Sequence, residues 1–290
     1  GFANVVARGS VGVVGASGTG IQEVTSLVHQ AGSGVSQAIG TGSRDLHADV
    51  GGSTTLQAIQ LLGNDPRTET IVLISKPSDP KVSRTVLRAL GATGKRTVAY
   101  LQSAPVETPA GVLRADSLEA AARLAVGQSA PEARSVREGT ANACQVRGLF
   151  CGGTLCQEAA AVLGDRHALE DFGDDRYTHG RAHPMLDPTL RNLAIAQAGR
   201  DPHVGVLLLD FILGLGAHRD PVGAALPAIE EAVSAARADG RALAVLAHVV
   251  GTDRDPQDLS RQEATLRSVG VHVCASNVAA ATLAGRMAPS

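Results

Sequence analysis

Aromatic residues are scarce in this sequence: they make up 2% of its 290 residues, and it has no tryptophan. Stacking platforms for single-stranded bases or for sugars are therefore not expected. An excess of one charge is also missing, since 26 Lys and Arg nearly balance 28 Asp and Glu. A net charge of −2 gives no basic footprint for nucleic acid, so we expect small anionic metabolites as ligands and no nucleic acid.

Long apolar runs and paired cysteines are missing too. The longest apolar run, from Val204 to Leu215, is shorter than the ~20 residues that a membrane helix needs and contains Asp210, so it predicts a buried strand and no membrane association. The four cysteines show neither C-x-x-C pairing nor the density of a secreted disulfide scaffold, and we expect a cytoplasmic protein. Because the chain opens without Met or a signal pattern, we expect a fragment or a processed product.

Apolar, strand-like runs alternate with helical patterns along the chain. After the first run, Ile21, Val24 and Val28 fall on one face of a helix. Such alternation is typical of an α/β fold with parallel sheets. The expected strands are residues 11–14, 35–39, 71–74, 97–101, 146–150, 204–209, 243–247 and 271–273.

The two halves of the sequence repeat each other. The stretch SGTGIQE at 17–23 aligns with GGTLCQE at 152–158, and Asp-Pro pairs flank a later strand in both halves. Markers in the same order predict two copies of one α/β domain, with a period too long for a solenoid. Residues 127–140 lose apolar periodicity. We therefore expect domains at 1–128 and 144–290, joined by a linker at 129–143.

Each copy places a glycine turn at the start of a helix. A helix start presents unpaired N–H groups and the positive end of the helix dipole, which suits an anion. Ser17 and Thr19 add hydroxyl groups in the first copy, and Thr154 does so in the second. The alternative is that Ser17 merely caps the helix. The spacing G-x-x-G-x-G from Gly15 fits neither a dinucleotide fingerprint nor a P-loop, and a nucleophile elbow lacks its last glycine.

Two cations lie in loops that follow expected strands. Arg44 comes after strand 35–39 and offers a charged donor for phosphate or carboxylate. Lys76 comes just past strand 71–74, at the carboxyl edge where open α/β sheets bind ligands. For Arg44, a solvated surface side chain is an equally good interpretation.

The segment 171–191 is long and charged, which is typical of functional or disordered loops. His179 and His183 lie in it, but no motif such as H-E-x-x-H supports a metal site, and we expect none. Cys151 and Cys156 flank a helix start that would stabilise a thiolate. Small buried thiols are the simpler interpretation.

Several blocks of the sequence together resemble the FdrA family. The most specific is HPMLDPTLR at 183–191, and the resemblance covers essentially the whole chain. The other blocks are residues 15–23, 39–46, 50–52, 73–77, 148–155 and 206–211. FdrA proteins are similar to succinyl-CoA synthetases and other acyl-CoA ligases. The resemblance implies an α/β fold of two tandem flavodoxin-like, succinyl-CoA synthetase-type domains with mainly parallel sheets.

In those enzymes, two helices point their N-termini at a shared phosphate site. For this chain the resemblance implies phosphate binding by Ser17, Gly18, Thr19, Gly152, Gly153, Thr154 and Leu155. Family members also carry an upstream CoA-binding-like domain, which we expect this chain to lack, so CoA would bind only with an additional domain. The synthetases' phosphohistidine loop would follow strand 97–101. Residues 102–111 contain no His, so that relay is not expected here.

The FdrA resemblance further implies a carbamoyl or acyl transferase subunit like oxamate carbamoyltransferase, acting on an acyl or carbamoyl phosphate. Arg44, Lys76, Asp187 and Arg191 are the expected substrate-binding residues. His183 is the candidate for proton transfer, and a structural hydrogen bond to the neighbouring turn is its alternative. Transfer of this kind runs mainly on positioning and charge stabilisation.

Two other functions stay open at this point. One is an ADP-forming acyl-CoA ligase fragment or subunit similar to succinyl-CoA synthetase. The other is a non-catalytic subunit that binds metabolite anions and organises an assembly. Under each we expect a homo-oligomer or companion subunits of a multi-subunit enzyme.

Overall fold

The computed structural model describes residues 2–102, 106–129 and 144–288. The chain forms two compact units: the first unit is Val6–Ala133, and the second unit combines Arg134–Ser290 with Gly1–Val5. The predicted linker, 129–143, lies outside the described residues except for Ser129. From the sequence, residues 1–5 were placed in the first domain. In the structure they belong to the second unit, where Ala3 forms an antiparallel bridge with Leu215.

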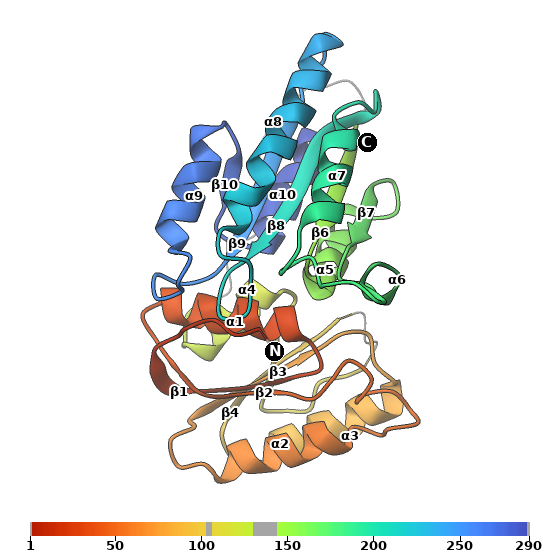
Figure 1. The fold of residues 1–290 in the computed structure, drawn as a ribbon. Helices are drawn as coiled ribbons and strands as arrows, with labels where there is room; N and C mark the ends of the chain where they lie inside the picture. Colours follow the sequence, from red (N-terminus) through yellow and green to blue (C-terminus); the bar gives the residue numbers. More distant parts are fainter. Residues whose placement is uncertain (1, 103–105, 130–143, 289–290) are drawn as a thin grey trace. The chain divides into compact units, whose positions relative to one another are not determined.

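The first unit is built on a five-stranded parallel sheet in the order β2-β1-β3-β4-β5. Its strands are β1 (Arg8–Gly15), β2 (Val35–Gly40), β3 (Thr70–Ser75), β4 (Arg96–Leu101) and β5 (Val112–Arg114). Every residue of β3 is buried, because helices cover both faces of the sheet. In Figure 1, α1 (Gly18–Gln30) and α4 (Leu118–Ala125) lie on one face, and α2 (Ser53–Asn64) and α3 (Pro80–Gly91) lie on the other.

The second unit is built on a five-stranded parallel sheet in the order β10-β9-β8-β6-β7. Its strands are β6 (Gln145–Phe150), β7 (Ala168–Asp171), β8 (Val204–Ile212), β9 (Ala244–Val250) and β10 (His272–Cys274). On one face lie α5 (Gly153–Leu163) and α10 (Asn277–Met287) (Figure 1). On the other lie α7 (Thr189–Ala198), α8 (Pro221–Ala238) and α9 (Leu259–Ser268), while the short α6 (Asp175–Thr178) follows β7.

Both sheets have the same topology when strands are counted within each unit, namely 2-1-3-4-5, the flavodoxin-like order. The predicted α/β fold of two tandem parallel-sheet domains is therefore confirmed, and all eight expected strands form. Two edge strands, β5 and β7, were not predicted. Their three and four residues carry no continuous apolar run, because an edge strand packs against fewer neighbours than a central one.

The apolar run around Asp210 forms the central strand β8, as predicted, and it is almost wholly buried. Every second side chain of β8 from Leu207 to Phe211 points to the face covered by α7 and α8. There, Leu207, Leu209 and Phe211 belong to one core cluster with Val222 and Ile229. Among the described residues, no helix has the length and apolar character needed to cross a membrane.

Candidate functional site

The start of α1 follows directly from the end of β1. The N–H of Ala16 donates to the carbonyl of Ile74 at 3.0 Å, which fixes the turn against the neighbouring strand. Ser17 is buried, and its Oγ accepts from the N–H of Gly20 at 2.9 Å. Its hydroxyl is thus used as a helix N-cap. Gly18 and Thr19 occupy the first turn, and a Cβ placed on the exposed Gly18 would meet nothing within 4 Å.

The predicted cations of the first unit lie in loops at the carboxyl edge of its sheet, where α1 also begins. Arg44 is exposed in the loop after β2, and Lys76 is half-buried directly after β3. Neither forms an ion pair with another residue in the described part of the chain. Binding of an anion by either side chain stays a prediction, and neither lines the pocket described below.

Asp45 orders the loop that carries Arg44. Its buried carboxylate accepts from the N–H groups of Thr54 and Thr55 and from the Thr55 hydroxyl, and so caps α2. Burial raises the pKa of Asp45, but these hydrogen bonds outweigh that effect and bring the pKa below its usual value. This role of Asp45 was not predicted from the sequence, because Thr54 and Thr55 lie in a different element, on the first turn of α2.

The start of α5 is built differently. The N–H groups of Cys151 and Gly152 donate to the two carboxylate oxygens of Asp210, at 2.6 and 2.8 Å. Gly152 is the N-cap residue and has no side chain to cap the helix. No described residue accepts a hydrogen bond from the N–H of Gly153 or of Leu155. Of the predicted phosphate-binding residues here, Gly152 already donates its N–H to Asp210. Gly153, Thr154 and Leu155 follow it in the first turn of α5.

Arg191 balances the charge of Asp210. Its Nη1 lies 3.0 Å from Oδ1 of Asp210 and donates to the Asp210 carbonyl oxygen at 2.6 Å. The guanidinium carbon stacks over the Phe211 ring at 5.0 Å, and the residue is 1% exposed. Burial raises the pKa of Asp210, while Arg191 and the two N–H groups favour its ionised form.

This arrangement corrects the role expected of Arg191. We predicted that it holds a substrate carboxylate, but the side chain is enclosed and already faces the carboxylate of Asp210. Arg191 belongs to a charged motif that suggested an exposed side chain, but it forms a buried ion pair with Asp210. The sequence signal for it was present, since Asp210 is the one charge inside an apolar run and a buried charge needs a partner.

The cysteines near α5 are structural. Cys151 and Cys156 are buried, and burial raises the pKa of both thiols, that of Cys156 to about 12. They are neutral thiols at physiological pH, as the simpler interpretation predicts. No group of three or more His, Cys, Asp or Glu residues suited to a metal ion occurs in the described ranges.

His183 lies in the turn that leads to α7. Its Nδ1 accepts from the N–H of Met185 at 3.3 Å, and its ring stands 5.4 Å from that of Phe2. Burial lowers the pKa of His183. This is the structural hydrogen bond named as the alternative, so a role in proton transfer stays a prediction. Asp187 accepts from the N–H and hydroxyl of Thr189 and so caps α7.

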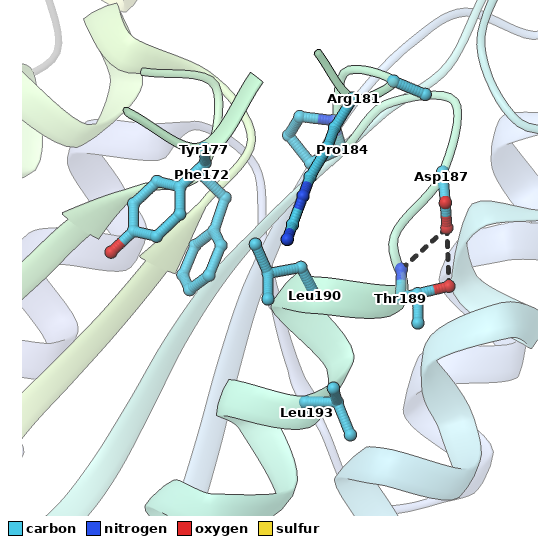
Figure 2. Close-up of a pocket in the computed structure, with 9 residues that line it drawn as sticks. Phe172, Tyr177, Arg181, Pro184, Asp187, Thr189, Leu190 and Leu193 are labelled. Carbon is cyan, nitrogen blue, oxygen red and sulfur yellow. Dashed lines mark hydrogen bonds between the residues drawn. The ribbon is translucent and has the colours of Figure 1, made fainter. Parts of the chain in front are cut away.

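A pocket of about 390 Å³ opens between α7 and the segment that follows β7 (Figure 2). Of its lining residues, only Asp187 was predicted from the sequence to bind a ligand. The pocket is lined by Phe172, Tyr177, Arg181, Ala182, Pro184, Asp187, Thr189, Leu190 and Leu193. All of them belong to the second unit.

Comparisons with known proteins match each unit to a different family model. Residues 149–287 match the CoA-ligase model, and residues 7–102 match the CoA binding domain model. The second match corrects our expectation that the chain lacks a CoA-binding region. The expected position of that region was upstream of the first unit, whereas the match lies within the first unit.

Similar sequences include those of two known proteins. The uncharacterized protein YahF of Escherichia coli (strain K12) is 41% identical over 324 residues, which covers 98% of this chain and 63% of YahF. The ADP-forming sulfoacetate-CoA ligase subunit SqwL of Acholeplasma sp is 34% identical over 100 residues, which covers 33% of this chain and 32% of SqwL. The chain thus spans less than two thirds of the length of either relative.

One similar solved structure is the apo form of the dinucleotide forming acetyl-coenzyme A synthetase 1 of Ca. Korarchaeum cryptofilum. The alignment covers 98% of this chain and 65% of the synthetase chain. The sequence identity is 14% and the TM-score is 0.35, too low to indicate a function. The matches to the two family models and to SqwL favour the ligase alternative over carbamoyl transfer, for which no comparison gives support. Together they support an acyl-CoA ligase-like family for this chain.

Proposed function

We propose that this chain is a subunit of an ADP-forming acyl-CoA ligase. The observation that carries the proposal is the coincidence of the CoA-ligase match, 149–287, with the uncapped helix start at Gly153. The activity named for SqwL points in the same direction. The FdrA resemblance is compatible with a ligase, and membership of that family stays a prediction.

Phosphate is the proposed ligand of the first turn of α5. The N–H groups of Gly153 and Leu155 have no described acceptor, and the helix dipole favours negative charge there. Thr154 is buried in the same turn, and the N–H of Gly152 is already used by Asp210. In the first unit, Gly18 and Thr19 offer a second helix start, whose third N–H is already capped by Ser17. That one phosphate is shared by both helix starts stays a prediction from the resemblance.

The first unit has donors that fit the phosphate groups of CoA. Gly18 faces open space, and Arg44 and Lys76 are cations without an ion-pair partner among the residues described. These residues would hold the phosphates, and CoA would supply the thiol that accepts the acyl group. Charge-assisted hydrogen bonds of Arg and Lys with phosphate are about twice as strong as neutral ones.

The protein's contribution to the reaction is positioning and charge stabilisation. N–H groups preorganised at a helix start stabilise charge on a transferring phosphoryl group without reorganising during the reaction. No His follows β4 within residues 102–111, so the proposal contains no phosphohistidine step. Because SqwL is named as a subunit of its ligase, we propose that companion subunits or copies complete the enzyme.

A paired assay tests the proposal. The chain is incubated with ATP, Mg²⁺, CoA and sulfoacetate or acetate, and CoA thioester is measured; in parallel, carbamoyl phosphate formation from oxalurate and phosphate is measured. We expect thioester only, together with saturable binding of CoA and of phosphate. Carbamoyl phosphate without thioester would reject the ligase. Phosphate binding with neither product would indicate a non-catalytic anion-binding subunit.

A further inference from the structure

We propose that the pocket of Figure 2 binds a small monocarboxylic acid with an apolar body. The pocket lies between α7 and the segment after β7, within the second unit. Binding there needs neither CoA nor nucleotide, so the proposal does not depend on the ligase activity.

The walls of the pocket are largely apolar. The ring of Phe172 stacks on that of Tyr177 with centroids 4.7 Å apart, and Leu190 and Leu193 stand opposite on α7 (Figure 2). Leu193 is 57% exposed, although it lines a concave surface. An apolar ligand body over these side chains would remove them from water, at roughly 25 cal/mol per Å² of buried apolar surface.

One cation reaches into this apolar surface. The side chain of Arg181 extends from its loop toward the space between Phe172 and Leu190 (Figure 2). No carboxylate among the described residues lies within 4.0 Å of its guanidinium. The other arginines nearby are occupied, since Arg147 and Arg176 pair with Glu170. Arg181 is thus a free bidentate donor over an apolar wall, which suits a carboxylate on an apolar chain.

One anion limits the charge that the ligand can carry. Asp187 lines the same pocket, and its Oδ1 accepts from the N–H of Thr189 at 3.1 Å and from its hydroxyl at 2.5 Å. These hydrogen bonds lower the pKa of Asp187, so it is ionised at neutral pH. A second carboxylate on the ligand would meet a like charge. The pocket therefore favours a monoanion over a dianion.

Three six-carbon compounds test this proposal by calorimetric or NMR titration of the full chain. Hexanoate carries one carboxylate, adipate carries two, and hexanamide carries none. We expect saturable binding of hexanoate, binding of adipate at least fivefold weaker, and no saturable binding of hexanamide. Arg181→Gln should weaken hexanoate binding at least tenfold.

Matched variants separate the two charges. Arg200→Gln removes an exposed arginine beyond the other end of α7, which pairs with Glu231, and should leave hexanoate binding unchanged. Asp187→Asn retains an oxygen that can cap α7 and should bring adipate within twofold of hexanoate. Equal binding of hexanoate and hexanamide, or hexanoate binding unaffected by Arg181→Gln, would overturn the proposal. So would the absence of saturable hexanoate binding up to 50 mM, the highest concentration to be used, well above the roughly 1 mM Kd that corresponds to −4.1 kcal/mol.

Discussion

The helix starts of α1 and α5 come from one repeated sequence but satisfy their N–H groups in different ways. At α1, the Ser17 hydroxyl caps Gly20 from within the turn. At α5, glycine replaces that serine, and Asp210 on the neighbouring strand β8 takes the two N–H groups before the helix instead. The first turn of α5 is left without a side-chain cap. A local cap has been exchanged for a long-range one, and we propose that the uncapped first turn of α5 binds an anion.

The largest effect should come from breaking the long-range cap. Asp210→Ala leaves Arg191 buried without its carboxylate and removes the acceptor of two N–H groups. Loss of one partner of a buried ion pair costs about 3–5 kcal/mol in free energy of unfolding, which urea denaturation followed by circular dichroism would measure. Arg200→Ala breaks an exposed ion pair with Glu231 and should cost less than about 1 kcal/mol. Similar losses in both variants would show that the Asp210 pair is not the support of this turn.

The next effect concerns binding. Gly153→Asp places a negative charge in the first turn of α5 and should weaken phosphate binding more than tenfold, measured by equilibrium dialysis with labelled phosphate. An acidic residue is tolerated at this helix position, so the circular dichroism spectrum should not change. Gly18→Asp is the matched variant in the first unit, where a side chain meets open space. Its effect on phosphate binding should be smaller, and an equal or larger effect would reverse the ranking of the two helix starts.

The local cap should matter less for stability than the long-range one. Ser17→Ala removes the acceptor of the Gly20 N–H and should lower the free energy of unfolding by about 1 kcal/mol, again by urea denaturation. Ser17→Asn is the control and should keep most of the stability. If Ser17→Ala instead abolished phosphate binding with the fold intact, the hydroxyl would be a ligand group and not a cap.

The smallest effect is a pH dependence of the second unit. Burial lowers the pKa of His183 below 6.5, and burial with Arg166 nearby does the same for His167. The unfolded chain then binds these protons more tightly than the folded one. The associated stability is complete above about pH 6.5 and is lost as the pH falls through the folded-state pKa values. Thermal unfolding at pH 7.5 and 5.5 would measure it, and His183→Gln should reduce the difference.

The sequence predicted the fold well, because parallel sheets require buried strands and those appear as short apolar runs. The apolar run 71–74 lies in β3 and the apolar run 204–209 lies in β8, the strands at the centre of each sheet. Edge strands such as β7 gave no such signal. The repeat likewise predicted both glycine turns, since a strand, a turn and a helix are neighbours in sequence.

The site was harder to predict, because its chemistry depends on pairs distant in sequence. Arg191 belongs to a motif rich in charge, and only the fold shows that it faces Asp210 on β8. Arg181 was not predicted as a binding residue. Nothing in the sequence distinguishes a cation that projects over apolar walls from the other arginines of the segment, and the pocket exists only once α7 packs beside Phe172.

Phosphate titration of ¹⁵N-labelled protein, followed by amide NMR, tests most directly whether the start of α5 binds an anion. We predict saturable shifts of the Gly153, Thr154 and Leu155 amide signals, larger than those of Gly18 and Thr19. Little change is expected at Gly152, whose N–H donates to Asp210. Signals of α5 that do not move while phosphate binds elsewhere would contradict this prediction.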